Sequence, residues 1–207
     1  MNKKLLAFSL GDGSIDKRYV LWNRQCEQQE EYLSWKHNEI SKEIECSNIK
    51  SGIQNGFKYF SFYTLTKLSN QNDLKEIREK LYEQRGVKYF SKEIVDEMDW
   101  FCFAVLYMDD GSLIAKKRNG IVSCYDLIIS IYGEKEECEN LIEKLNSFGL
   151  KFTLKYNKGK YSIRCGTKSA RKFINFIKPY CSDIHCFDST KFKPIITNSQ
   201  YLREEFG

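Results

Sequence analysis

Two short stretches of the chain are apolar at nearly every position, and both end in the same way. Residues 5–10 run into the sequence Gly-Asp-Gly at 11–13, and residues 100–108 run into Asp-Asp-Gly at 109–111. Such a segment predicts a buried helix that carries a carboxylate at its C-terminal end. The helix macrodipole makes that end partly negative, so a carboxylate there is favourable only with a cation close by.

The same order of elements follows each of these helices: two strands, a helix, two strands and a helix. In the first half the pattern predicts a helix over 3–11, strands within 14–25 and 45–66, and helices over 27–43 and 72–85. In the second half it predicts helices over 99–109, 134–148 and 168–178, the last ending at Pro179, with strands over 112–118, 121–132, 150–157 and 160–165. Residues 87–98 are expected to be a connector, and 180–207 show no clear period.

This repetition predicts an α+β fold made of duplicated α-β-β-α-β-β-α units. We place the halves at residues 1–95 and 96–207. A duplicated unit buries its open face against its copy, and the two most apolar helices are the natural contact. Small residues at Ala7, Gly11 and Ala104 would let these two helices approach closely.

Composition limits the classes of protein that remain. The net charge of +5 is a modest excess that favours a polyanionic partner. With only two histidines, histidine-based nuclease and metalloprotease motifs are nearly excluded. No apolar run is long enough to span a membrane. None of the eight cysteines forms a Cys-x-x-Cys pair, which predicts free thiols in a reducing space, either the cytoplasm (for a bacterial or phage-encoded protein) or an organelle.

The polar side of the predicted strands is cationic. Across the last strand pair, apolar residues alternate with Lys151, Thr153, Lys155, Lys160, Ser162 and Arg164. The first hairpin of each half adds Lys17, Arg18, Asn23, Arg24 and Gln25, and then Lys116, Lys117 and Arg118. A two-stranded ribbon fits the DNA major groove, where such side chains contact phosphates and base edges. We therefore expect double-stranded DNA as the partner.

The segments at 5–13 and 103–111 resemble the paired motifs of the LAGLIDADG homing endonucleases, in the form that has both motifs in one chain. The segments at 106–111 and 176–180 resemble the I-SceI-like branch most closely. The resemblance implies a monomer with a pseudo-two-fold axis, in which the motif helices pack centrally and two antiparallel sheets form a DNA-binding saddle. It also implies a metal-dependent double-strand break in a long asymmetric site, leaving 3′ overhangs.

The resemblance assigns the metal to Asp12 and Asp110. Hard oxygen donors favour Mg²⁺, for which Mn²⁺ can substitute. Gly11 and Asp109 are further candidate ligands; Asp109 would supply a carbonyl or a further acid, or would simply cap its helix. By matching position, Lys88 and Lys191 are the expected basic residues of the active site, with Gln25 and Ser130 as weaker candidates beside it.

Two other functions on the same fold stay open. One is an intron-encoded RNA maturase, whose partner would be intron RNA and which would not need metal at the Asp pair. The other is a non-catalytic DNA-binding regulator, which is disfavoured because Asp12 and Asp110 are both present. The sequence departs from many family members at Leu10 and Met108, where those members carry Asp.

Overall fold

The computed structural model describes residues 1–65, 71–82, 86–119, 121–131 and 133–186, and it confirms the duplicated α+β order. The first half consists of α1 (Lys3–Leu10), β1 (Ser14–Ile15), β2 (Leu21–Cys26), the 3₁₀ turn η1 (Glu27–Gln29), α2 (Glu30–Ser41), β3 (Lys50–Gln54), β4 (Phe57–Tyr63) and α3 (Gln71–Tyr82). The second consists of α5 (Trp100–Asp110), β5 (Gly111–Arg118), β6 (Ile121–Ser130), α6 (Lys135–Ser147), β7 (Thr153–Asn157), β8 (Lys160–Gly166) and α7 (Thr167–Cys181).

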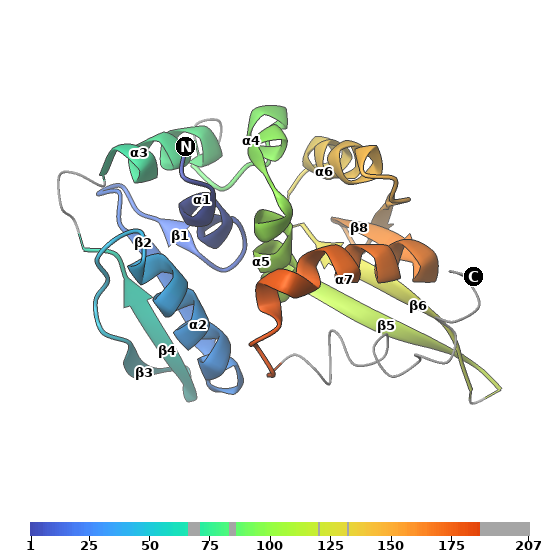
Figure 1. Ribbon diagram of the computed structural model, residues 1–207, viewed down its shortest axis with the longest axis horizontal. Coiled ribbons are helices and arrows are strands. Elements are labelled where there is room, and N and C mark those ends of the chain that lie inside the picture. Colours follow the sequence, from blue (N-terminus) through green and yellow to red (C-terminus); the bar gives the residue numbers. More distant parts are fainter. Residues whose placement is uncertain (66–70, 83–85, 120, 132, 187–207) are drawn as a thin grey trace.

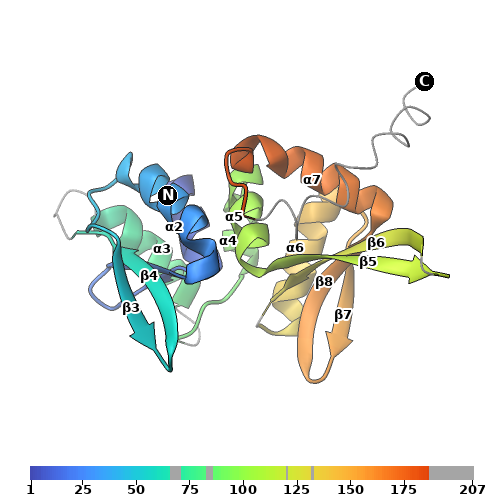
Figure 2. The same ribbon diagram turned by 90° about the horizontal axis from the view of Figure 1, so that it is seen from below.

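Each half contains a four-stranded antiparallel sheet with equivalent strand order, β1-β2-β4-β3 in the first and β5-β6-β8-β7 in the second. The turns that join β3 to β4 and β7 to β8 also match. Asn55 and Gly56 have φ of 53° and 81°, and Lys158 and Gly159 have 48° and 80°, as a tight two-residue hairpin turn requires. The helices cover one face of each sheet, and both hairpins extend to the same side of the molecule (Figure 2). We call the two uncovered faces together the saddle.

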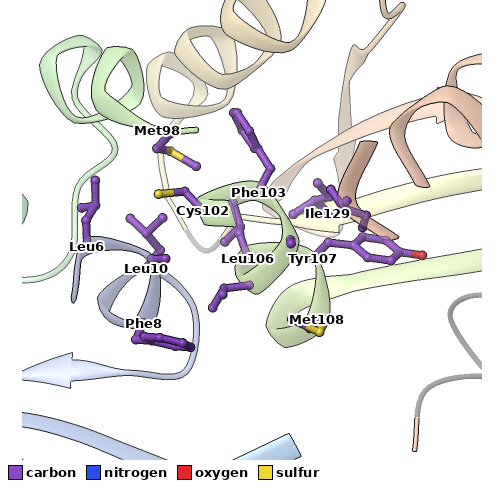
Figure 3. Close-up of a cluster of buried hydrophobic side chains, with 14 of the residues drawn as sticks. Leu6, Phe8, Leu10, Met98, Cys102, Phe103, Leu106, Tyr107, Met108 and Ile129 are labelled. Carbon is purple, nitrogen blue, oxygen red and sulfur yellow. The ribbon is translucent and has the colours of Figure 1, made fainter. Parts of the chain in front are cut away.

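Helices α1 and α5 lie side by side between the two sheets (Figure 1). Both start at a capping side chain: Asn2 accepts from Lys4 N and Leu5 N, and Asp99 accepts from Cys102 N. Every residue from 102 to 108 is buried, and Figure 3 shows Leu6 and Leu10 of α1 in one hydrophobic cluster with Cys102 and Leu106 of α5. Ala7 and Ala104 are fully buried, as expected for close helix packing.

The structure differs from the sequence prediction at two helices. The expected connector contains α4 (Lys92–Glu97), which is capped by Ser91 and buries Ile94 and Val95. A helix of six residues is too short to show a clear hydrophobic period. The predicted half-domain boundary at 95 and 96 falls inside α4 and stays a prediction.

Helix α7 continues past Pro179 to Cys181, so the predicted stop at that proline is wrong. Ile177 and Cys181, one turn apart, are both buried. Their burial outweighs the backbone hydrogen bond that a proline removes in the last turn. The cysteines are free thiols among the described residues, as expected. No described helix is both long enough and apolar enough to cross a bilayer.

The central helix packing predicts that truncating a buried side chain lowers the free energy of unfolding much more than truncating an exposed one. Leu106→Ala removes a fully buried side chain from α5 and is expected to lower the free energy of unfolding by about 2–5 kcal/mol. The control Ile53→Ala, at a side chain that is 77% exposed, should change it by less than about 0.5 kcal/mol. Urea denaturation followed by circular dichroism measures both, and equal losses would contradict this account of the central packing.

Candidate active site

The two predicted metal-binding acids line one pocket. Asp12 follows the end of α1, Asp110 ends α5, and both line a cavity of about 210 Å³. The rest of the lining includes the predicted candidates Gly11, Lys88 and Ser130, together with Leu10, Phe90, Ile131, Gly133 and Glu137. The packing of α1 against α5 therefore brings together residues that lie almost a hundred positions apart.

Lys88 reaches the pocket from the segment that follows α3. Its Nζ donates to the carbonyl of Leu10 at 3.0 Å and to the carbonyl of Gly11. Carbonyls at a helix C-terminus lack partners within the helix, and a lysine there satisfies them and complements the helix dipole. Burial lowers the pKa of Lys88 to about 8, although the nearby carboxylates of Asp109, Asp110 and Asp12 act in the opposite direction.

The structure corrects the DNA-facing assignment of Asn23 and Gln25. Leu21, Asn23 and Gln25 alternate along β2 and are all buried on the face that the helices cover. Gln25 lies beside two motif acids instead, where its Nε2 donates to Asp12 Oδ2 at 3.0 Å and is 3.4 Å from Asp109 Oδ1. The alternation in the sequence is the signal that separates these residues from Arg24, which is exposed.

The side chain of Asp109 is fully buried and makes internal contacts. Its Oδ2 accepts from the backbone N–H of Asp12 at 2.9 Å, and its Oδ1 accepts from Lys36 Nζ at 2.7 Å. This placement argues against the expectation that the Asp109 carboxylate is a further metal ligand, and it leaves the carbonyl as the candidate donor.

Lys36 was not among the predicted site residues. It lies on α2, one turn from both Tyr32 and Ile40, which are fully buried. A lysine in the middle of an apolar helical face is the signal that marks it, because such a charge is buried only when a partner is present.

The oxygen donors of the pocket fit a hard divalent cation. No group of three or more His, Cys, Asp or Glu side chains that would hold a metal occurs in the described part of the chain. Mg²⁺ does not need such a group, because it is commonly bound by one or two carboxylates and keeps waters or substrate phosphates as its other ligands. The carboxylates of Asp12 and Asp110, with backbone carbonyls beside them, match that requirement.

The second-half face of the saddle carries most of the predicted cations. Lys155 and Ser162 line a hollow of about 290 Å³ there, together with Lys160. Lys116 and Arg164 both contact Asp126 Oδ2, at 2.6 and 3.0 Å, so this face also contains an acid, contributed by β6. The other predicted residues on or beside the sheet are exposed: Lys117, Arg118, Lys151 and Thr153. Lys151 precedes β7, and its backbone N–H donates to Ser169 of α7, so it lies at the edge of the sheet.

The first-half face combines cations with aromatic rings. The guanidinium of Arg24 lies 4.2 Å from the centre of the Tyr59 ring and donates to Gln54 at 2.7 Å. These residues line a hollow of about 440 Å³ that reaches from Asp12 to Phe57. Lys17 and Arg18 are exposed in the turn between β1 and β2, where Arg18 pairs with Asp16. Lys191 lies outside the described residues.

A central pair of acid-bearing helices flanked by two equivalent sheets defines a duplicated two-motif architecture. The model of the LAGLIDADG DNA endonuclease family matches residues 8–173, and the chain belongs to this family. Among solved structures, the fold resembles the homing endonuclease I-WcaI bound to its DNA recognition sequence, with a TM-score of 0.67, 22% identity, and coverage of 86% of this chain and 80% of that one.

The chain also resembles one protein of lower sequence identity and matches part of another. Full-length DUF199/WhiA from Thermatoga maritima has a TM-score of 0.52 and 14% identity, with coverage of 99% of this chain and 61% of that one. A RecA protein of Mycobacterium shimoidei is 32% identical over 90 residues, which are 44% of this chain. The match spans only 19% of that RecA protein.

The burial of Lys88 predicts a pH dependence of stability in metal-free buffer. Its pKa of about 8 lies below that of an unfolded lysine, so between about pH 8 and 10.4 the unfolded chain binds more protons at this residue. Its contribution to the unfolding free energy therefore rises over that window, by at most about 1.4 kcal/mol per pH unit. Comparing urea denaturation of the wild type and Lys88→Met from pH 7 to 10.4 isolates this contribution. Parallel pH profiles would contradict the lowered pKa.

Proposed function

We propose that the chain is a site-specific homing endonuclease that makes a metal-dependent double-strand break in a long asymmetric DNA site and leaves 3′ overhangs. The observation that carries this proposal is the shared pocket of Asp12, Asp110 and Lys88, positioned between the two halves of the saddle. We further propose that the chain acts as a monomer, because it already contains both motifs and both sheets.

In this mechanism Asp12 and Asp110 would hold Mg²⁺, or Mn²⁺ in its place, with the carbonyls of Gly11 and Asp109 as additional donors. When bound, the metal would supply an activated water and neutralise charge on the phosphate and on the leaving oxygen. Gln25 orients the carboxylate of Asp12 through its hydrogen bond. Lys88, held against the end of α1, adds positive charge beside the scissile phosphate. Lys191 is proposed as the second basic residue.

The saddle would hold the duplex through phosphate and base contacts. Exposed cations near both hairpins provide the sequence-independent attraction, and Arg24, ordered by Tyr59 and Gln54, is prepared to contact a base edge. The proposed contacts are those of Lys17, Arg18, Arg24, Lys116, Lys117, Arg118, Lys151, Thr153, Lys155, Lys160, Ser162 and Arg164. Because the two faces differ in their side chains, the preferred site would be asymmetric.

Removing either acid should abolish cutting without abolishing binding. Asp12→Asn and Asp110→Asn each keep the shape of the side chain and remove the charge that holds the metal, so the cleavage rate should fall at least about a hundredfold. The substrate is a labelled duplex with the sequence of the intron-free insertion site, which is the DNA that a homing endonuclease would cut. It is incubated with Mg²⁺. Asp183→Asn, at an exposed carboxylate outside the pocket lining, serves as the control.

Cutting that persists in both variants would refute the assignment of the two acids. Restored intron splicing by a wild-type protein that cuts no DNA would favour the RNA maturase instead.

The cations of the saddle predict a steep salt dependence of DNA binding. Affinity for a 30-base-pair duplex of random sequence should fall linearly on a log–log plot against salt concentration. Lys155→Gln should reduce the magnitude of that slope by about 1, because one phosphate contact is lost. Lys75→Gln, on α3 and paired with Glu79, should leave the slope unchanged. Fluorescence anisotropy titrations at several salt concentrations measure the slopes, and equal slopes for all three proteins would count against the saddle.

A further inference from the structure

A buried ion pair joins the two halves beneath the pocket. Lys36 lies on α2 of the first half, Asp109 lies on α5 of the second, and both side chains are 0% exposed with 2.7 Å between Nζ and Oδ1. The ammonium group also lies 4.5 Å from the centre of the Tyr32 ring, whose hydroxyl is 3.4 Å from the carbonyl of Val105. The carboxylate of Asp109 and the ring face of Tyr32 therefore both stabilise the positive charge of the lysine.

The pair makes a buried carboxylate available as a hydrogen-bond acceptor. An isolated charge in this place would be strongly unfavourable, whereas a paired and hydrogen-bonded charge is tolerated. With Lys36 on Oδ1, the other oxygen of Asp109 accepts the backbone N–H of Asp12 at 2.9 Å. Gln25 spans the same two acids, so the peptide and the carboxylate of Asp12 are both held.

This arrangement exists on one side of the pseudo-two-fold axis. The motif position that carries Asp109 in the second half carries Gly11 in the first, which has no side chain with which to hold Asp110. A Cβ atom added to Gly11 would lie 2.2 Å from Asp109 Oδ2, so the glycine provides the space that Asp109 occupies. The two halves of the active site therefore support their acids by different means.

We propose that Lys36 is a positioning residue that fixes Asp12 through Asp109, so that the cleavage of one DNA strand depends on this pair more than the cleavage of the other. The inference rests on the proposed function, with Asp12 and Asp110 each serving mainly one strand. Residues that orient metal ligands typically change metal affinity or activity ten- to a hundredfold when they are replaced.

The test is a strand-resolved cleavage assay on a duplex that carries a different label on each strand. The main variant combines Lys36→Met with Asp109→Asn, which removes both charges and leaves neither charged group buried without its partner. We expect the ratio of the two strand-cleavage rates in the double variant to differ at least tenfold from the wild-type ratio. Asp109→Asn alone should show the same bias, and Lys36→Arg should keep most of the wild-type ratio. Equal slowing of both strands in the double variant would overturn the inference.

Leu33→Ala is the matched control, because it removes a fully buried side chain from the same helix without touching the ion pair. It should slow both strands equally if it slows them at all, which separates a loss of stability from a loss of positioning. A strand bias as large in Leu33→Ala as in the double variant would also overturn the inference.

Mn²⁺ binding to the protein without DNA gives a second readout that does not depend on cleavage. We expect calorimetric titration to show at least tenfold weaker Mn²⁺ binding in the double variant than in the wild type. A wild-type protein that cuts no DNA would refute the proposed function, while this weakening would still support the positioning role. Unchanged Mn²⁺ affinity in that case would overturn the positioning role as well.

Discussion

The active site depends on how closely α1 and α5 approach each other. The two helices bring the ends of their motifs into one pocket because the residues between them are apolar or small. Gly11 shows how little space remains, since a Cβ atom there would lie 2.2 Å from Asp109 Oδ2 at the end of α5. A larger residue in this interface would separate the two acids, and the oxygen donors would no longer form a single site.

Close approach has an electrostatic consequence. Bringing two helix C-termini together concentrates partial negative charge where two carboxylates already lie. The protein compensates with two lysines that differ in their partners: Lys88 contacts the carbonyls at the end of α1, and Lys36 contacts the carboxylate of Asp109. A bound divalent cation would add to this compensation. The cationic groups thus make the central helix packing compatible with the acids that it brings together.

Much of the fold could be predicted from the sequence because it follows from local patterns. The continuous apolar runs identify α1 and α5, and the alternation of apolar and polar residues identifies the strands β7 and β8. Helix α4 was missed because six residues show too little of a helical period. The extension of α7 beyond Pro179 was missed because burial of Cys181, a tertiary effect, overrides the local preference of proline.

The site could be predicted where a motif or a matching position marked it. Asp12, Asp110, Gly11 and Lys88 meet in the pocket, and Gln25, a weaker candidate, contacts Asp12, whereas the place of Lys36 depends on which face of α2 turns inward. Composition cannot supply that information, because a lysine on α2 has the same charge whether it faces solvent or Asp109. Periodicity does supply it: Gln25 shares the buried face of Leu21, and Lys36 falls between Tyr32 and Ile40.

The two halves have equivalent topology, but their side chains differ, so the halves are not interchangeable. On the saddle, Arg24 of the first half lies against an aromatic ring, whereas Arg164 of the second pairs with Asp126. At the centre, Gly11 faces Asp109 and only one of the two motifs has a carboxylate at that position. Duplication thus accounts for the common framework, and the differences lie on the saddle and beside the acids. The asymmetric target and the unequal strand cleavages that we propose follow from this distribution of side chains.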